Sequence, residues 1–181
     1  PICYVDYILG DEVIIPRDHQ HFYSEKIAYL PHSFMVADAS RTIPDVAVSR
    51  QQAGLPESGF VFCSFNASFK ITPEAFAVWM RLLERIGDSV LWLPFDNDAV
   101  VSNLRKQAVA HGIAPERLIF SRRAEQLADY FARYRVADIF LDTFPFNAGA
   151  TANDALWAGL PLLTCSGEVY TSRIAGSLTV Y

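Results

Sequence analysis

Short apolar runs and helical segments alternate along the chain from residue 59 onward. The apolar runs are typical of buried strands, and the segments between them carry the apolar spacing of amphipathic helices. The predicted strands are residues 60–65, 89–94, 117–121, 136–141 and 160–163. The predicted helices are residues 97–111, 124–134 and 150–158, with one more beginning at Thr72 and another near residue 170. This order predicts an α/β fold, in which helices flank a parallel sheet of about five strands.

The helix that begins at Thr72 has the clearest start signal and the clearest apolar face. Threonine is a preferred N-cap residue, and Pro73 suits the first helical position. The apolar residues that fall on one face of this helix are Phe76, Trp79, Leu82, Leu83 and Ile86. That spacing predicts an amphipathic helix.

Residues 1–50 differ in pattern from the rest of the chain. Helical periodicity is poor there, although residues 4–10 are compatible with a strand. Prolines at positions 16, 31 and 44 interrupt any long element. We therefore expect an irregular extension that packs on another part of the protein, and we place a domain boundary between residues 50 and 51. His19 and His21 have the spacing of metal ligands on a strand, but no third ligand lies nearby, so we expect no metal there.

Composition narrows the class of protein. The chain has 181 residues, 51% hydrophobic and 19% charged, which is enough for one core or for one domain with an appendage. A net charge of −5 argues against a nucleic-acid partner. No apolar run approaches the roughly 18 residues of a membrane span. Cys3, Cys63 and Cys165 form no Cys-x-x-Cys pair and lie in apolar contexts, so we expect reduced core thiols of a cytoplasmic protein.

The stretch from residue 136 to residue 164 predicts a ligand site. Strand, loop, helix start and strand follow one another, and ligands of open α/β sheets bind at such loops. The amides of Ala150, Thr151 and Ala152 would lie free at the helix N-terminus and favour an anion. Asp154 would project from the same first turn as Thr151. The alternative interpretation is a plain Thr-x-x-Asp helix cap.

Two further loops carry candidate chemistry. Lys70 follows the first strand of the predicted sheet and could reach phosphates held at residues 149–151; the alternative is a solvated lysine. Tyr130 could stack on a nucleobase or could simply pack its helix. Asp96-Asn97-Asp98 has a shape used for metal–nucleotide binding, but between a strand and a helix we favour capping.

The motifs of three common enzyme classes are missing from the sequence. No Gly-x-Gly-x-x-Gly follows the first strand of the predicted sheet, and the chain has no P-loop motif and no Gly-x-Ser-x-Gly. These absences argue against a dinucleotide oxidoreductase, a P-loop NTPase and an α/β-hydrolase.

Long collinear stretches of the chain resemble the C-terminal half of the catalytic region of O-linked N-acetylglucosamine transferases, including bacterial homologues and the plant SPINDLY group. The stretches are residues 62–71, 89–93, 117–120, 132–161 and 172–177, with shorter matches between residues 6 and 31. The resemblance implies a GT-B architecture, in which two Rossmann-like domains enclose a nucleotide sugar. Residues 51–181 would be the C-terminal donor-binding domain, lacking its closing helices, and residues 1–50 the end of the N-terminal catalytic domain.

The resemblance also implies an activity. Family members are inverting, metal-independent glycosyltransferases, so the implied reaction moves a sugar to Ser/Thr hydroxyls of a protein acceptor, and the expected donor is UDP-GlcNAc, which supplies N-acetylglucosamine. No metal or other cofactor would be needed. The family's tetratricopeptide repeats and most of its N-terminal catalytic domain are not in these residues, so we expect the chain alone to be inactive.

Site residues carry over by position, with Lys70 as the catalytic residue. The implied contacts are Lys70 to the diphosphate, Gly149, Ala150 and Thr151 to the phosphates, Asp154 to the ribose hydroxyls, Tyr130 to the base, and Asn66 with Ala67 at the start of the donor loop. The chain has Gly-Ala-Thr where many members have His-Thr-Thr, alanine for a glutamine at position 67, and tyrosine for a histidine at position 130. These departures leave the sugar and the base open.

Two other functions remain open at this point. The chain could be a non-catalytic nucleotide-binding or interaction module of the same fold, because fold alone does not determine function. It could also be a scaffold piece without a ligand. In either case the incomplete ends would expose apolar surface, and we expect the chain to self-associate.

Overall fold

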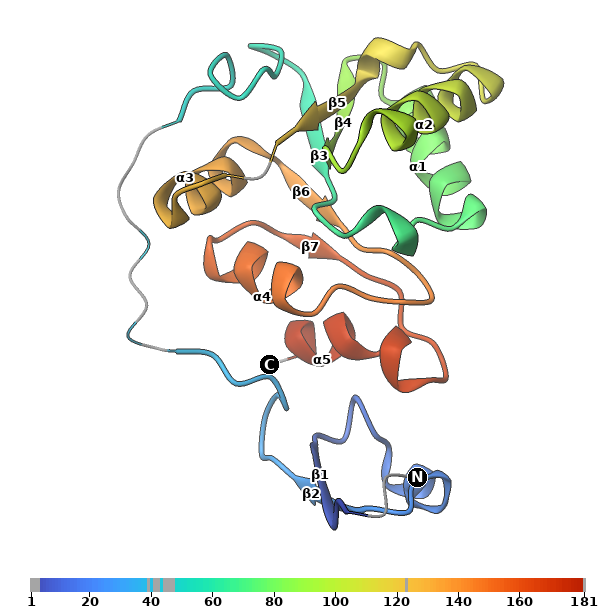
Figure 1. Cartoon of the computed structure of the whole chain (residues 1–181), viewed down its shortest axis with the longest axis vertical. Helices are drawn as coiled ribbons and strands as arrows, with labels where there is room; N and C mark the ends of the chain where they lie inside the picture. Colours follow the sequence, from blue (N-terminus) through green and yellow to red (C-terminus); the bar gives the residue numbers. More distant parts are fainter. Residues whose placement is uncertain (1–3, 39, 41–42, 44–47, 123, 181) are drawn as a thin grey trace.

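The computed structural model describes residues 4–38, 40, 43, 48–122 and 124–180. After residue 50 its centre is a five-stranded parallel sheet with the order β5-β4-β3-β6-β7 (Figure 1). The strands are β3 (Phe60–Cys63), β4 (Ser89–Pro94), β5 (Leu118–Ser121), β6 (Ile139–Leu141) and β7 (Leu162–Leu163). The predicted α/β fold with parallel strands is therefore confirmed.

Helices cover both faces of this sheet. The helices are α1 (Pro73–Arg85), α2 (Asp98–Ala110), α3 (Leu127–Ala132), α4 (Ala150–Trp157) and α5 (Ile174–Val180). Helices α1 and α2 pack on one face, and α3, α4 and α5 pack on the other (Figure 1). Alternate residues of β3 point to opposite faces of the sheet. Val61 and Cys63 pack in the core beneath α3, α4 and α5, and Phe62 packs in the core beneath α1 and α2.

Two of the predicted helix starts are confirmed by their hydrogen bonds. The Thr72 hydroxyl accepts the Ala75 N–H at 3.2 Å at the start of α1. Asn97 caps α2, because its Oδ1 accepts the Val100 N–H at 3.0 Å. The capping interpretation of Asn97 is thus correct.

Three predicted details are wrong. Ile86 does not belong to the buried face of α1: it is the C-cap residue and remains 39% exposed, because the chain turns there toward β4. The helix expected over residues 124–134 begins only at Leu127 and tightens into the 3₁₀ helix η4 (Arg133–Val136) before β6. Cys165 is exposed beyond the edge strand β7, whereas Cys63 is buried in β3 as expected. Cys3 lies outside the described residues.

The N-terminal segment contains its own small sheet. Strands β1 (Tyr7–Gly10) and β2 (Lys26–Tyr29) pair in parallel, with the 3₁₀ helix η1 (Arg17–Phe22) between them. The strand expected within residues 4–10 is therefore present, and its partner β2 is an addition to the expected irregular chain. The domain boundary at residue 50 stays a prediction.

A buried carboxylate attaches this segment to the C-terminal part of the chain. Asp11 Oδ2 accepts the Phe34 N–H at 2.7 Å and the Ser177 hydroxyl of α5 at 2.5 Å. The Arg173 guanidinium, just before α5, donates to the Val13 carbonyl at 2.5 Å. The N-terminal segment thus packs on the end of the chain, as expected of an extension without a core of its own.

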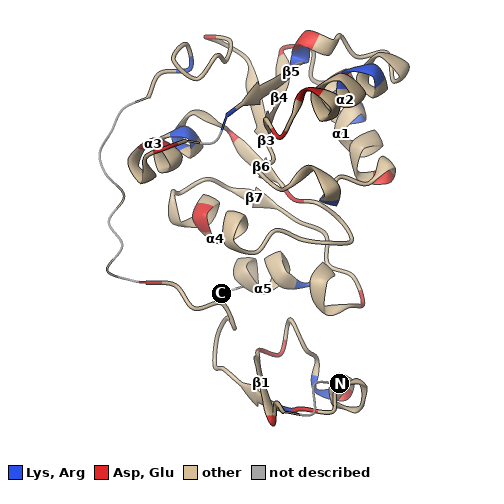
Figure 2. Ribbon diagram, viewed as in Figure 1, with Lys and Arg blue, Asp and Glu red and all other residues tan. Residues whose placement is uncertain are grey.

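Charges are mixed along the ribbon. Figure 2 shows acidic and basic positions interspersed over the described residues, in keeping with the net charge of −5. Within the same ranges, each helix is too short or too polar to pass through a membrane.

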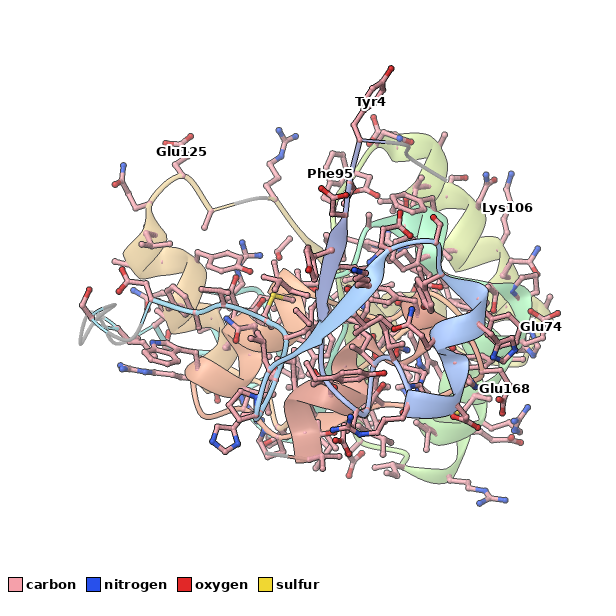
Figure 3. All side chains as sticks on the ribbon, turned by 90° about the horizontal axis from the view of Figure 1, so that it is seen from below. Tyr4, Glu74, Phe95, Lys106, Glu125 and Glu168 are labelled. Atoms are coloured by element: carbon pink, nitrogen blue, oxygen red, sulfur yellow. The ribbon has the colours of Figure 1, made fainter. Side chains whose placement is uncertain are left out.

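Self-association stays a prediction, and exposed apolar side chains of the N-terminal segment support it. Tyr4 projects away from the ribbon (Figure 3), and Phe22 and Val36 are 70% and 82% exposed. We expect light scattering to show a mass that rises with concentration. Combining Phe22→Ser with Val36→Ser should return the mass toward that of a monomer, whereas Val109→Ser on α2 should not. A constant monomer mass at high concentration would count against the prediction.

Candidate functional site

A cleft of about 1170 Å³ lies at the carboxyl edge of the sheet. We call it the edge cleft. Its walls come from the chain after β3, β4 and β5 and from helices α3 and α4, and they include Phe65, Phe95, Asp96, Ser121, Glu125, Tyr130, Arg133, Ala150, Thr151 and Asp154. Figure 3 shows the Glu125 side chain directed away from the ribbon. This is the edge at which open α/β sheets bind ligands.

Asp142 organises the loop that leads into α4. It directly follows β6, and its Oδ1 accepts the backbone N–H groups of Thr143 at 2.7 Å and Ala148 at 2.6 Å. Its Oδ2 accepts the Thr164 hydroxyl, beyond β7, at 2.6 Å. Burial raises the pKa of Asp142, and these hydrogen bonds oppose the rise. One carboxylate therefore joins the ends of two strands to the loop that leads into α4.

The loop over residues 143–148 is further held by its own polar side chains. The Thr143 hydroxyl donates to the Phe146 carbonyl at 2.7 Å, and the Asn147 amide donates to the Thr143 carbonyl at 2.9 Å. The Phe144–Pro145 peptide is cis. Asn66, at the end of β3, donates to the Thr143 hydroxyl at 3.1 Å. The position of the α4 N-terminus is therefore set by contacts to β3, β6 and β7.

The first turn of α4 faces the edge cleft with its amides. Gly149 is the N-cap and provides no side-chain cap. The first intrahelical bond runs from the Asn153 N–H to the Gly149 carbonyl at 3.0 Å, so the amides of Ala150, Thr151 and Ala152 precede the hydrogen-bonded helix. Such a helix start attracts anions.

The Thr-x-x-Asp capping interpretation of this turn is wrong. The Thr151 hydroxyl donates to Asn66 Oδ1 at 2.8 Å, across to the end of β3. Asp154 accepts the Tyr130 hydroxyl of α3 at 2.8 Å. Both side chains serve contacts between elements, which a spacing rule within one helix does not describe.

Lys70 is held by the loop that leads into α4 and is not among the residues that line the edge cleft. It ends the 3₁₀ helix η2 (Ser68–Lys70), and its ammonium donates to the Asn147 carbonyl at 2.9 Å. The same nitrogen sits 3.9 Å from the centre of the Phe146 ring. Burial lowers the pKa of Lys70, and the nearby Asp142 carboxylate opposes that effect. Ala67, the other member of this loop predicted to touch the donor, is exposed.

Tyr130, half-buried, belongs to a polar group in the cleft wall. Its hydroxyl lies 2.9 Å from the Tyr134 hydroxyl and 2.8 Å from Asp154 Oδ2. The Arg133 guanidinium lies 5.1 Å from the centre of the Tyr130 ring and 4.9 Å from that of Phe65. Burial raises the pKa of Tyr130 to about 12, so the phenol stays protonated near neutral pH.

The structure brings half of the predicted site residues together. Tyr130, Ala150, Thr151 and Asp154 line the edge cleft. Asn66, Ala67, Lys70 and Gly149 are not among its lining residues, although Asn66 accepts the Thr151 hydroxyl and Lys70 donates to the Asn147 carbonyl of the loop before α4.

Sequence reasoning missed Phe65, Arg133 and Asp142. Asp142 could have been predicted, because a polar residue directly after an apolar strand lies at the edge of the sheet. Arg133 could not have been predicted, because its position in the cleft wall depends on how η4 packs on Phe65.

The acidic loop after β4 serves local structure. Asp96 Oδ2 accepts the Ser68 N–H at 3.1 Å, and Asn97 caps α2. Among the described residues, no group of three or more His, Cys, Asp or Glu side chains could hold a metal ion. A metal-independent reaction stays a prediction.

An open parallel sheet flanked by helices on both faces defines a Rossmann-like α/β domain. The sequence model of Glycosyl transferase family 41 matches residues 2–49 and 41–180. The chain therefore belongs to glycosyl transferase family 41.

Curated relatives and a solved structure agree with this assignment. The chain is 37% identical over 180 residues to the probable UDP-N-acetylglucosamine–peptide N-acetylglucosaminyltransferase SEC of Arabidopsis thaliana, covering 97% of this chain and 18% of that protein. It is 37% identical over 132 residues to the UDP-N-acetylglucosamine–peptide N-acetylglucosaminyltransferase of Caenorhabditis elegans, covering 71% of this chain and 11% of that protein. A mutant O-GlcNAc transferase of Thermobaculum terrenum superposes with a TM-score of 0.81 and 26% identity, covering 97% of this chain and 33% of that one. The chain thus spans less than a fifth of the length of these curated relatives.

The role of Asp142 can be tested by stability. Asp142→Ala leaves two backbone N–H groups and a hydroxyl without their acceptor, so we expect a loss of about 2–4 kcal/mol in the free energy of unfolding. Urea denaturation measures it. Glu84→Ala, on the exposed side of α1, is the control and should change stability by less than about 0.5 kcal/mol. An equally small effect at Asp142 would show that the carboxylate does not hold the loop.

Proposed function

We propose that this chain is the donor-binding half of an inverting, metal-independent glycosyltransferase that moves N-acetylglucosamine from UDP-GlcNAc to Ser/Thr hydroxyls of proteins. One observation carries the proposal: the edge cleft presents a helix N-terminus, a carboxylate and an aromatic ring in one wall. These groups suit the phosphates, the ribose and the base of a nucleotide. The names of the relatives supply the sugar, the nucleotide and the peptide acceptor.

In the proposed complex, the start of α4 binds the diphosphate. The amides of Ala150, Thr151 and Ala152 point out of the helix N-terminus, where the helix dipole favours negative charge. Asn66 holds the Thr151 hydroxyl at 2.8 Å, which keeps the first turn in place before a ligand arrives. Gly149 and Ala150 have no side chain that can donate a hydrogen bond. The backbone amides therefore make most of the hydrogen bonds to the diphosphate.

Lys70 supplies the positive charge in this proposal. In the free protein its ammonium donates to the Asn147 carbonyl, in the loop that leads into α4. In the complex the ammonium donates to a diphosphate oxygen instead. During transfer the acceptor hydroxyl gives its proton to a general base while its oxygen attacks the anomeric carbon. The bond from that carbon to the diphosphate oxygen breaks, and its electron pair stays with the diphosphate. Lys70 and the α4 amides stabilise that developing charge.

Asp154 and Tyr130 hold the nucleoside. Asp154 lies one turn into α4, 9% exposed, and its carboxylate accepts the ribose hydroxyls. The half-buried Tyr130 ring packs against the base, as aromatic side chains do on other nucleotides. Arg133, stacked on Tyr130, adds positive charge to the same wall.

A second candidate function has specific support. The Lys70 ammonium is already paired with the Asn147 carbonyl, and no side chain at positions 149 and 150 can donate to a phosphate. A non-catalytic nucleotide-binding module of the same fold would show these features too. Nucleotide binding without sugar turnover by the protein that carries this chain would favour it.

Calorimetric titration of the chain with UDP and then GDP tests the binding site. We expect one of the two to bind, and Lys70→Ala to weaken that binding about tenfold, because a charge-assisted hydrogen bond is lost. Lys106→Ala is the matched control, since Lys106 is an exposed lysine of α2 (Figure 3). If neither nucleotide binds, the donor-binding proposal fails.

The catalytic role of Lys70 predicts a distinct pH profile. Because burial lowers its pKa from 10.5, the ammonium loses its proton below that pH, and kcat/KM should fall as the pH rises through the lowered value. Lys70→Arg keeps the charge and should shift this alkaline limb upward. Lys70→Ala should lower kcat by more than it raises KM. The same alkaline limb in all three proteins would assign it to another group, and unchanged turnover by Lys70→Ala would remove Lys70 from the reaction.

A further inference from the structure

We infer that Tyr130 is a positioning residue for Asp154, and that this pair makes the edge cleft select ribonucleotides over 2′-deoxyribonucleotides. The inference rests on the proposed function, because it assigns Asp154 to the ribose. The inference adds that Tyr130 acts through its hydroxyl, in addition to any contact between its ring and the base.

The direction of the hydrogen bonds follows from their chemistry. An ionised carboxylate only accepts, so the Tyr130 hydroxyl donates its proton to Asp154 Oδ2 at 2.8 Å. That hydroxyl has one proton, so the contact of 2.9 Å with Tyr134 must be donated by Tyr134. The result is a relay from Tyr134 to Tyr130 to Asp154.

Packing leaves this relay little freedom. Tyr134 is fully buried, and its ring meets the rings of Phe65 and Tyr130 edge to face at 5.3 and 5.4 Å. Tyr130 also meets Phe131 edge to face at 5.3 Å, and the Arg133 guanidinium covers its ring at 5.1 Å. A hydroxyl mounted on such a ring fixes the plane of the carboxylate that it contacts.

A fixed carboxylate distinguishes sugars by their hydroxyl groups. A carboxylate has about four acceptor sites, and Tyr130 takes one of them. A ribose presents two neighbouring hydroxyl donors, whereas a 2′-deoxyribose presents one. A site built to accept a hydroxyl rejects an analogue without it more strongly when the acceptor is buried and oriented. The high pKa of Tyr130, about 12, keeps the orienting proton in place over the working pH range.

The test compares UDP with 2′-deoxyuridine diphosphate by calorimetry, or the GDP pair if guanine is the base that binds. The wild-type chain should bind the ribonucleotide about tenfold or more tightly than the deoxyribonucleotide. Tyr130→Phe keeps the ring and removes the hydroxyl, so it should lower this ratio to about threefold or less, mainly through the ribonucleotide. Tyr29→Phe, in the N-terminal sheet, is the matched control and should keep the wild-type ratio.

A double substitution separates positioning from a general loss of structure. In an Asp154→Ala background, Tyr130→Phe should leave the remaining ratio unchanged, because the acceptor that it orients is gone. Thermal unfolding of each variant accompanies the titrations.

Three results would overturn the inference. The first is a wild-type ratio near one, and the second is a ratio that Tyr130→Phe does not alter. The third is an equal loss of both nucleotides in Tyr130→Phe, which would restrict the residue to stacking on the base. Binding of neither UDP nor GDP by the wild-type chain would instead overturn the proposed function, and the inference with it.

Discussion

The candidate site depends on one partly buried carboxylate. Asp142 directly follows β6, where an unpaired charge would be costly, so it must collect hydrogen-bond donors. It finds them in the loop that follows and beyond β7, at Thr143, Ala148 and Thr164. The loop therefore turns back under the strand ends, and α4 starts against β3, where Asn66 receives the Thr151 hydroxyl. The open helix start that suits an anion is a consequence of this arrangement.

A second aspartate gathers hydrogen-bond donors at the other end of the molecule. Asp11 is buried, and it gathers donors from its own turn, from Phe34 and from Ser177 of α5. Asp11 thereby connects the N-terminal sheet to α5, and the Arg173 guanidinium adds a second link through the Val13 carbonyl. Substitutions at these two aspartates would consequently disturb distant parts of the chain.

Predictions from sequence succeeded where the cause is local and failed where it is not. Thr72 and Asn97 cap their helices because the acceptor and the amide belong to the same turn. The Thr-x-x-Asp interpretation of Thr151 and Asp154 failed because partners from β3 and α3 were available to both side chains. Ile86 kept the right spacing but lies where the helix ends, and Cys165 is apolar in context but follows an edge strand. In each failure a tertiary neighbour, or its absence, outweighed the local pattern.

By itself the sequence determined the alternation of strands and helices, the parallel sheet and the edge at which a ligand would bind, because hydrophobic period and turn residues act over a few positions. Its resemblance to a known family indicated which residues gather there. Only the tertiary structure decided what those residues do to one another: that Lys70 rests on the Asn147 carbonyl, and that Tyr130 donates to Asp154. The physical reason is that hydrogen bonds between elements depend on distances and directions created by packing, and no spacing along the chain encodes them.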